Sequence, residues 1–339
     1  MKNIGKYARG AVITSLMFPF MLNAQDKSIY GNDDRLDYYQ ASPAMRQLAD
    51  SVVSLWPSKQ VKLENGEYKL ATVNYGEAVN LCPGETFSEQ PIGSFCSGTL
   101  VGPDIIMTAG HCITDEAQCA DTKFVFGYNI GSEGGKANTS AKLKDLYNCK
   151  RIIKRDLDKQ PGGIFGIGIA IIGALLNKAG PDYALVQLDR PVEGRKPLPV
   201  NRNGSIGKGE SVFVIGHPVG LPAKITGGGT VRDNSPKSFF LTDLDTFGGN
   251  SGSAVFNART NLIEGVLVRG GTDFADTEKG CKVQVRTGQN EGRGEAVTKI
   301  SKLSKYIPLL KSAEAPVVKD MTFDGTLTPD EALEHQIRF

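Results

Sequence analysis

Hydrophobic positions between residues 68 and 310 come in short runs that Gly, Pro or Asp residues separate. The runs are rich in β-branched and aromatic residues, which is the composition of β-strands. Before a polar linker at residues 191–209 they occupy residues 68–75, 93–101, 104–110, 123–129, 147–154 and 183–189. After the linker they occupy residues 211–218, 222–231, 238–245, 252–257 and 262–270. Two sets of about six short strands predict an all-β fold of two antiparallel six-stranded β-barrels, with the boundary at the linker.

Two other segments have apolar residues at helical spacing. Residues 42–56 begin with Ser42 and Pro43, a typical helix start, and residues 295–310 predict a short C-terminal helix. We therefore expect three further divisions of the chain: an N-terminal arm or pro-segment at residues 25–67, a folded domain at residues 68–312 and a polar tail at residues 313–339.

Residues 1–24 have the parts of a secretory signal peptide. Basic residues precede an apolar run at residues 11–22, and Ala24 offers a small residue before a polar segment. Pro19 interrupts the run, which is shorter than the ~20 residues that a membrane-spanning helix needs. The sequence therefore predicts export, with the mature protein secreted or periplasmic.

Residues 163–176, GIFGIGIAIIGALL, form an apolar stretch rich in glycine. Its composition is similar to that of membrane-inserting peptides, but the stretch is too short to span a bilayer. We favour a buried strand or hairpin inserted between barrel strands, and membrane contact through this stretch is the alternative.

The overall composition argues against two kinds of partner. The 339 residues are 22% charged and carry a net charge of +2, so nothing favours binding to nucleic acid or to an acidic membrane surface. Six cysteines, an even number, are compatible with disulfides in an exported chain. The sequence has no CxxC and no Cys/His cluster, so we expect no metal and no other cofactor, and we expect a monomer.

Three histidines are candidates for a general base at neutral pH. His111 ends an apolar strand in the sequence TAGHC, whereas His335 lies in the tail. His217, in VIGHPVG, follows a strand of the second set, where a turn or packing role is the simpler interpretation.

Ser251 is the candidate nucleophile because it lies in the glycine-rich sequence GGNSGSAVF. A nucleophilic serine needs a base, an orienting carboxylate and backbone donors for an oxyanion. Glycines beside it allow the N–H groups of Gly249 and Ser251 to point at one spot. Asp182 begins the apolar strand DYALVQLD, and a buried carboxylate there needs a partner such as an imidazole. Each of these motifs, taken alone, also fits a simple turn.

The motifs TAGHC, DYALVQLD and GGNSGSAVF, in this order, together resemble those of the trypsin-fold serine endopeptidases. The resemblance covers roughly residues 80–310 and is nearer to the bacterial glutamyl-endopeptidase (V8-like) branch than to the digestive trypsins. It implies that His111 is the general base, Asp182 its orienting carboxylate and Ser251 the nucleophile. It also implies an oxyanion hole formed by the amides of Gly249 and Ser251. The order of the motifs excludes an α/β-hydrolase, in which the serine comes first.

The resemblance also implies a disulfide between Cys96 and Cys112, which flank the strand that carries His111. Closing such a loop of ~15 residues is worth about 3 kcal/mol in chain entropy. Six cysteines allow 15 pairings, so the rest of the pairing stays open. The arrangement we favour for the other four is Cys119 with Cys149 and Cys82 with Cys281.

Substrate-binding residues follow from the same resemblance. Asp245 lies six residues before Ser251, at the base of the primary specificity pocket, where it would bind a substrate Arg or Lys at P1. Glutamate-specific relatives use a threonine, which Thr246 matches, and a histidine on the pocket wall. The wall segment that contains Arg269 and Gly270 has no histidine, so a basic P1 residue is favoured. The alternative is that Asp245 pairs with Arg269 and does not face the substrate.

The sequence thus predicts a secreted serine endopeptidase that cleaves protein or peptide substrates through an acyl-enzyme. The alternatives are a glutamyl endopeptidase, a catalytically silent trypsin-fold protein that binds a partner, and a membrane-active protein that uses residues 163–176.

Overall fold

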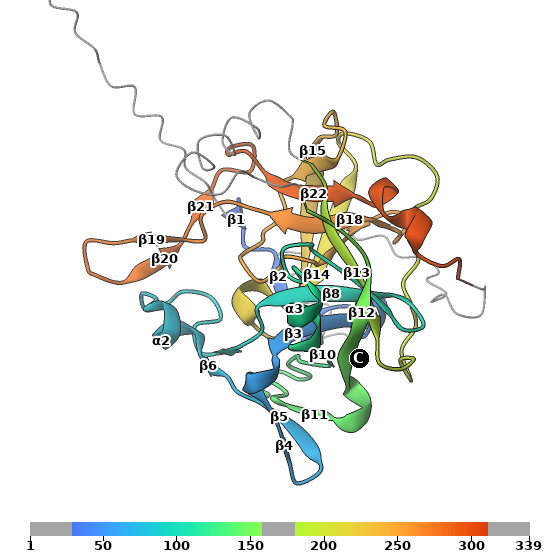
Figure 1. Cartoon of the computed structure of the whole chain (residues 1–339). Helices are drawn as coiled ribbons and strands as arrows, with labels where there is room; N and C mark the ends of the chain where they lie inside the picture. The colour runs from blue at the N-terminus through green and yellow to red at the C-terminus, as the bar shows by residue number, and fades with distance from the viewer. Residues whose placement is uncertain (1–28, 158–179, 311–339) are drawn as a thin grey trace, which may run out of the picture.

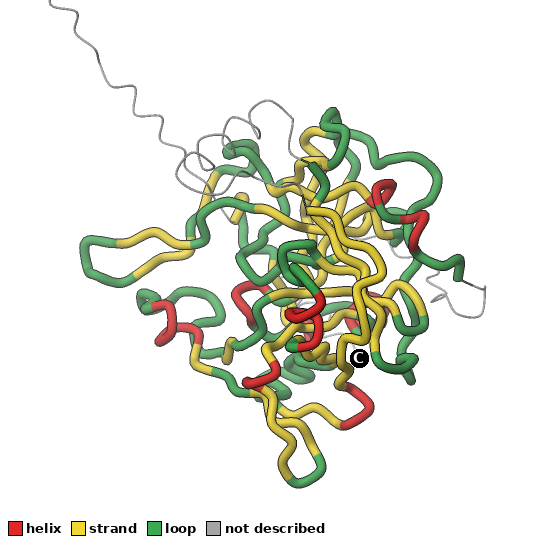
Figure 2. The backbone as a smooth tube through the Cα atoms, in the orientation of Figure 1, coloured by secondary structure: helices red, strands yellow, loops and turns green. Residues whose placement is uncertain are grey.

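The computed structural model describes residues 29–157 and 180–310, and strands and loops make up most of this part of the chain (Figure 2). The expected signal peptide at residues 1–24, the apolar stretch at residues 163–176 and the tail at residues 313–339 lie outside the described residues. The α-helices in the described part are short: α1 Pro43–Ala49, α2 Tyr75–Val79 and α3 Glu116–Ala120. Within these residues no helix is both long and apolar enough to cross a membrane.

Six antiparallel strands close into the first barrel, in the order β10-β12-β13-β9-β8-β3. Their bounds are β3 Val52–Pro57, β8 Cys96–Gly102, β9 Ile105–Thr108, β10 Thr122–Phe126, β12 Leu146–Leu157 and β13 Asp182–Leu188. Pairing of β10 with β3 closes the ring, so neither strand is left as an open edge. Apolar side chains such as Leu55, Ile106 and Phe124 are fully buried and form the core.

The second barrel pairs its strands in the order β14-β17-β18-β22-β16-β15, and a β14–β15 pairing closes the ring. Its strands are β14 Ser211–Gly216, β15 Lys224–Asp233, β16 Phe239–Thr242, β17 Ala254–Asn257, β18 Ile263–Arg269 and β22 Glu295–Lys299. The blue-to-green first barrel lies against the yellow-to-orange second barrel in Figure 1. The prediction of an all-β fold with two antiparallel six-stranded barrels is confirmed.

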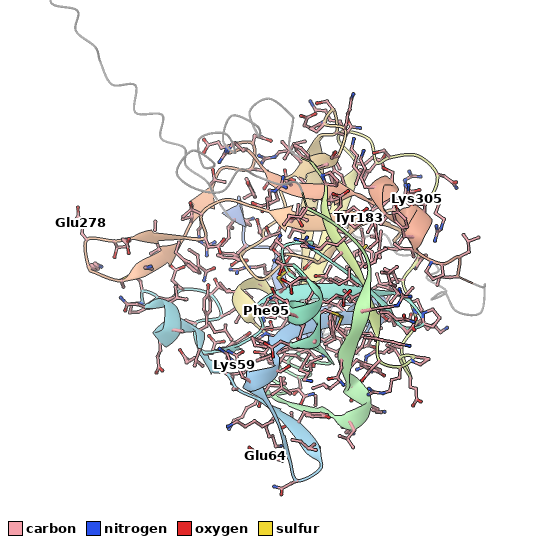
Figure 3. The ribbon with its side chains drawn as sticks, in the orientation of Figure 1. Lys59, Glu64, Phe95, Tyr183, Glu278 and Lys305 are labelled. Carbon is pink, nitrogen blue, oxygen red and sulfur yellow. A yellow bond between two sulfur atoms is a disulfide. The ribbon has the colours of Figure 1, made fainter. Side chains whose placement is uncertain are left out.

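Short strand pairs surround the barrels. They are β4 Val61–Glu64 and β5 Glu67–Leu70 with β11 Ser140–Lys142, β6 Val73–Asn74 with β7 Pro91–Ile92, and β19 Phe274–Asp276 with β20 Lys282–Gln284. Glu64 and Glu278 mark the tips of two projecting hairpins in Figure 3. Near the N-terminal end of the described chain, β1 Ile29–Tyr30 pairs with β21 Arg286–Thr287, and β2 Arg35–Asp37 pairs with β15.

The expected start of the folded domain at residue 68 is wrong. Residues 52–57, which we expected to continue a helix of the arm, form β3, a strand of the first barrel. The run is buried on both faces, so it lacks the alternation that would mark a strand. Residues 68–75, expected to be a barrel strand, contribute to β5, β6 and α2 outside the barrel.

The expected C-terminal helix is shorter than its sequence pattern indicates. Residues 295–299 form β22, which pairs with both β16 and β18. Only two single turns of 3-10 helix follow, Ile300–Lys302 and Ser304–Tyr306. Non-local pairing to two strands therefore overrides the helical spacing of this segment.

All six cysteines form disulfides in the structure. The pairs are Cys96–Cys112, Cys119–Cys149 and Cys82–Cys281. The first confirms the pairing that the family resemblance implies, and the other two match the arrangement we favoured. Cys82–Cys281 joins two segments that are 199 residues apart in the sequence.

Candidate active site

His111 and Asp182 form a hydrogen-bonded pair at the end of the first barrel. His111 follows β9 after the short segment Ala109-Gly110, and Asp182 is the first residue of β13, the neighbouring strand. The Nδ1 atom of the imidazole lies 2.8 Å from Oδ2 of Asp182. The carboxylate is buried, whereas 38% of the imidazole side chain is exposed. The ring is thus anchored on one side and open on the other.

The second carboxylate oxygen of Asp182 is held by the backbone. Oδ1 accepts the N–H of Gly110 at 2.7 Å and the N–H of His111 at 3.2 Å. Together with the bond to His111, these hydrogen bonds fix the orientation of the carboxylate. A Cβ on Gly110 would lie 2.6 Å from the Asp156 carbonyl oxygen, so the close approach of this loop requires glycine.

The second barrel fixes the main chain of Asp182. The Thr298 hydroxyl of β22 accepts the N–H of Asp182 at 3.1 Å and donates to its carbonyl oxygen at 2.9 Å. Sequence reasoning missed Thr298, because nothing in a single sequence shows that β22 lies beside the start of β13.

Ser251 lies in a tight turn that contains two glycines with positive φ. Gly249 has φ +88° and Gly252 has φ +93°, a region that residues with a Cβ rarely adopt. A Cβ on Gly249 would lie 2.7 Å from the His217 carbonyl oxygen. The glycines flanking Ser251 therefore serve the backbone conformation of the turn.

Two carbonyl groups of this turn accept hydrogen bonds from the main chain. The Gly248 carbonyl accepts the Val219 N–H at 2.5 Å, and the Asn250 carbonyl accepts the Ser253 N–H at 2.9 Å. In a planar trans peptide the N–H is opposite to the C=O, so the N–H groups of Gly249 and Ser251 each point away from the hydrogen bond that the preceding carbonyl accepts. Within the described residues neither of them donates to another group. Two such donors can bind an anionic oxygen.

Ser97 on β8 supports the same turn. Its hydroxyl accepts the His217 N–H at 2.9 Å and donates to the Gly249 carbonyl at 2.8 Å. Its backbone N–H donates to the Ser251 carbonyl at 2.9 Å. Sequence analysis did not single out Ser97, because both hydrogen bonds of its hydroxyl join it to residues more than 100 positions away.

The Cys96–Cys112 disulfide brings the His111 loop and the Ser251 turn to one place. Cys112 follows His111, and its sulfur lies 3.6 Å from the Ser251 carbonyl oxygen. In the described chain no hydrogen bond joins the His111 ring to the Ser251 hydroxyl, and such contacts in ligand-free sites often tighten only with substrate. The two sulfurs and the imidazole lie within 4.8 Å, but the disulfide removes the thiolates that a metal would need.

A pocket of about 120 Å³ opens beside Ser251. This is about the volume of four waters at ≈ 30 Å³ each, enough for one side chain. Predicted residues Thr246, Arg269 and Gly270 line it. The other lining residues include Phe247, Gly248, Leu267, Val268, Gly271, Asp273 and Glu295. Glu295 is a site residue that sequence analysis missed, because it was assigned to a helix.

Asp245 is not among the residues that line this pocket in the described part of the chain. Its carboxylate accepts the backbone N–H of Tyr30 at 2.7 Å and that of Asp34 at 2.9 Å. Burial raises the pKa of Asp245 to about 8, although the two hydrogen bonds act to lower it. Asp245 thus faces the N-terminal segment and not the pocket, against the expectation that it forms the pocket base, and none of the ion pairs of the described residues joins it to Arg269. Asp245 holds the N-terminal segment on the second barrel.

His217 has the packing role expected for it. The side chain is buried, its Nδ1 lies 3.0 Å from the Leu221 carbonyl oxygen, and its ring stacks on Tyr128. Burial lowers the pKa of His217 to about 4, so it is neutral at physiological pH. Of the two described histidines, His111 is the exposed one.

Residues 96–263 match the family model described as the trypsin-like peptidase domain. This segment contains His111, Asp182 and Ser251. No curated protein matches the sequence significantly.

The solved structures that are similar to this chain include two proteases. One is the Rv3671c protease in its inactive form, with 11% identity, a TM-score of 0.40 and coverage of 78% of this chain and 90% of that chain. The other is the Vibrio cholerae VesB protease, with 14% identity, a TM-score of 0.45 and coverage of 81% of this chain and 66% of that chain. At these identities and TM-scores, neither likeness bears on function.

Proposed function

We propose that the protein is an exported serine endopeptidase in which Ser251 is the nucleophile, His111 the general base and Asp182 the orienting carboxylate. The observation that carries the proposal is the His111–Asp182 pair beside a turn in which the Gly249 and Ser251 N–H groups donate to no other group of the described residues. The trypsin-like peptidase domain supports the same reaction class.

In the proposed reaction His111 Nε2 takes the proton of the Ser251 hydroxyl as Oγ attacks the carbonyl carbon of the scissile bond. The N–H groups of Gly249 and Ser251 stabilise the oxyanion that forms. The imidazolium then gives its proton to the leaving amine, and a water molecule hydrolyses the acyl-enzyme by the same steps. Asp182 keeps the proton of His111 on Nδ1 throughout.

Export is supported by the three disulfides, which form and persist in oxidising compartments. The signal peptide at residues 1–24 stays a prediction from the sequence.

The side chain that precedes the scissile bond would enter the pocket beside Ser251. The glutamyl-endopeptidase alternative requires a glutamate there. The described residues that line the pocket include Asp273 and the buried Glu295 against one cation, the half-exposed Arg269, and none of them is a histidine. This balance of charged groups does not favour an acidic side chain.

The test is hydrolysis of a peptide library by the full exported chain and by the Ser251→Ala variant. We expect cleavage by the unaltered protein and none above background by the variant. Equal cleavage by both would show that the activity does not use Ser251. A biological effect that persists unchanged in the inactive variant would favour the alternative of a trypsin-fold binding protein.

A further inference from the structure

Glu295 is a buried carboxyl group in the pocket beside Ser251. It begins β22, is 1% exposed and lines the pocket together with Thr246 and Gly270. A Cβ on Gly270 would collide with the Glu295 carboxylate, so the absence of a side chain there gives the carboxyl group its space. Gly270 and Glu295 thus form a wall of the pocket that also contains Ser251. A substrate side chain that enters this pocket would contact the Glu295 carboxyl group.

Neutral groups hold the Glu295 carboxyl in place. The Thr246 hydroxyl donates to Oε2 at 2.7 Å, and the hydroxyl of Tyr30, from β1, lies 3.5 Å from Oε1. None of the ion pairs among the described residues involves Glu295. A buried carboxylate without a counter-cation is costly, so this site gains from a cation that arrives with the substrate.

The other charged groups at the pocket are Asp273 and Arg269. Asp273 accepts the Gly248 N–H at 2.8 Å, and its charge, like burial, opposes ionisation of Glu295. Arg269 ends β18 and is half-exposed, whereas Glu295 is 1% exposed and lies enclosed in the pocket wall. Burial raises the pKa of Glu295 well above its usual range, and a bound cation would favour the ionised form again.

We propose that Glu295 is the residue that selects a lysine or arginine at P1, by accepting the charged head of that side chain in the pocket beside Ser251. The inference rests on the proposed endopeptidase function. Asp245, to which the sequence analysis assigned recognition of a basic P1 residue, faces the N-terminal segment. We assign that recognition to Glu295, on β22.

The experiment compares peptides that differ only at P1: lysine against norleucine, arginine against citrulline, and glutamate. We expect the unaltered protein to prefer the charged member of each of the first two pairs. Glu295→Gln keeps the shape of the side chain and removes its charge, and it should lower the lysine-to-norleucine ratio of kcat/KM by about 10²-fold or more. The ratio does not depend on the amount of folded enzyme, since both peptides meet the same molecules.

Glu264→Gln is the matched control. Glu264 lies on β18, is buried, and has both carboxylate oxygens bound by the Asn201 amide, outside the pocket. Its replacement should leave the P1 ratio unchanged. A preference for norleucine or glutamate in the unaltered protein, or a ratio unaffected by Glu295→Gln, would overturn the assignment.

A second measurement keeps the proposal testable if Glu295→Gln does not fold. In the unaltered protein the lysine-to-norleucine ratio of kcat/KM should rise with pH, because ionisation of Glu295 strengthens only the contact with the charged side chain. Effects of pH on the bond-breaking step are common to both peptides and cancel in the ratio. A ratio that is independent of pH would contradict the proposal. Cleavage with a P1 preference other than lysine or arginine refutes this inference alone, whereas absent cleavage and absent labelling of Ser251 refute the proposed function as well.

Discussion

Replacement of Asp182 by asparagine tests the orienting role of this carboxylate. The asparagine amide must place either its oxygen or its NH₂ group where Oδ1 accepts the N–H groups of Gly110 and His111. An NH₂ group there would leave those two donors without an acceptor, at roughly 1–3 kcal/mol for each. The amide oxygen therefore takes that place, and the NH₂ group faces Nδ1 of His111.

A donor facing Nδ1 favours the imidazole tautomer with its proton on Nε2, which cannot take the proton of Ser251. Loss of the correct tautomer lowers kcat by about 10⁴-fold. This corresponds to about 5.5 kcal/mol in the activation free energy, at 1.36 kcal/mol for each factor of ten.

The assay is kcat and kcat/KM on one peptide substrate, with thermal unfolding measured on the same preparations. Asp189→Asn is the control, because Asp189 follows the other end of β13 and is an exposed partner of Arg190. We expect activity within about twofold of the unaltered protein for this control, since exposed pairs contribute little. A folded Asp182→Asn variant that retains more than a tenth of kcat would refute the reasoning.

Three further changes have expected outcomes. Gly249→Ala places a Cβ at positive φ against the His217 carbonyl. This change should lower the free energy of unfolding by roughly 1–3 kcal/mol and lower kcat by about 10²-fold or more. Unchanged kinetics in the folded variant would exclude an oxyanion role for this turn. Replacing Cys82 and Cys281 by serine opens a loop of about 200 residues and should cost up to about 5 kcal/mol in urea unfolding; no change in midpoint would contradict this estimate. The pKa of Asp245 is about 8 in the folded protein, against an ordinary value of 3.8. Between these pH values the folded protein keeps a proton that the unfolded chain releases, so the free energy of unfolding should fall as pH rises. Asp245→Asn removes this titration, so its stability should depend less on pH, and parallel curves for the two proteins would argue against a raised pKa.

The strands of the barrels and the motifs around His111, Asp182 and Ser251 could be found in the sequence, because each depends on residues that are adjacent in the chain. Short runs bounded by turn residues define strands, and His111 and Ser251 lie where such runs end in glycine-containing loops. Burial then separates the two described histidines, since Tyr128 and Leu221 enclose His217 whereas the His111 side chain is 38% exposed.

The residues that sequence reasoning misplaced depend on pairing between distant strands. Residues 52–57 and 295–299 have patterns compatible with helix, and only the barrels make them strands. The pairing of β22 with β18 then brings Glu295 opposite Gly270. Asp245 has the sequence offset of a pocket residue, but the N–H groups of Tyr30 and Asp34 turn its carboxylate away. The position of the Glu295 carboxyl group and the orientation of the Asp245 carboxylate cannot be inferred from residue spacing in one sequence.

The most direct test of the account is covalent labelling by a fluorophosphonate, located by mass spectrometry of the digested protein. We expect one adduct per chain on Ser251, and none after His111→Ala, because the hydroxyl needs the imidazole to become nucleophilic. Exported protein that cleaves peptides without an adduct on Ser251, or with the adduct on another residue, would contradict the assignment of Ser251 as the nucleophile.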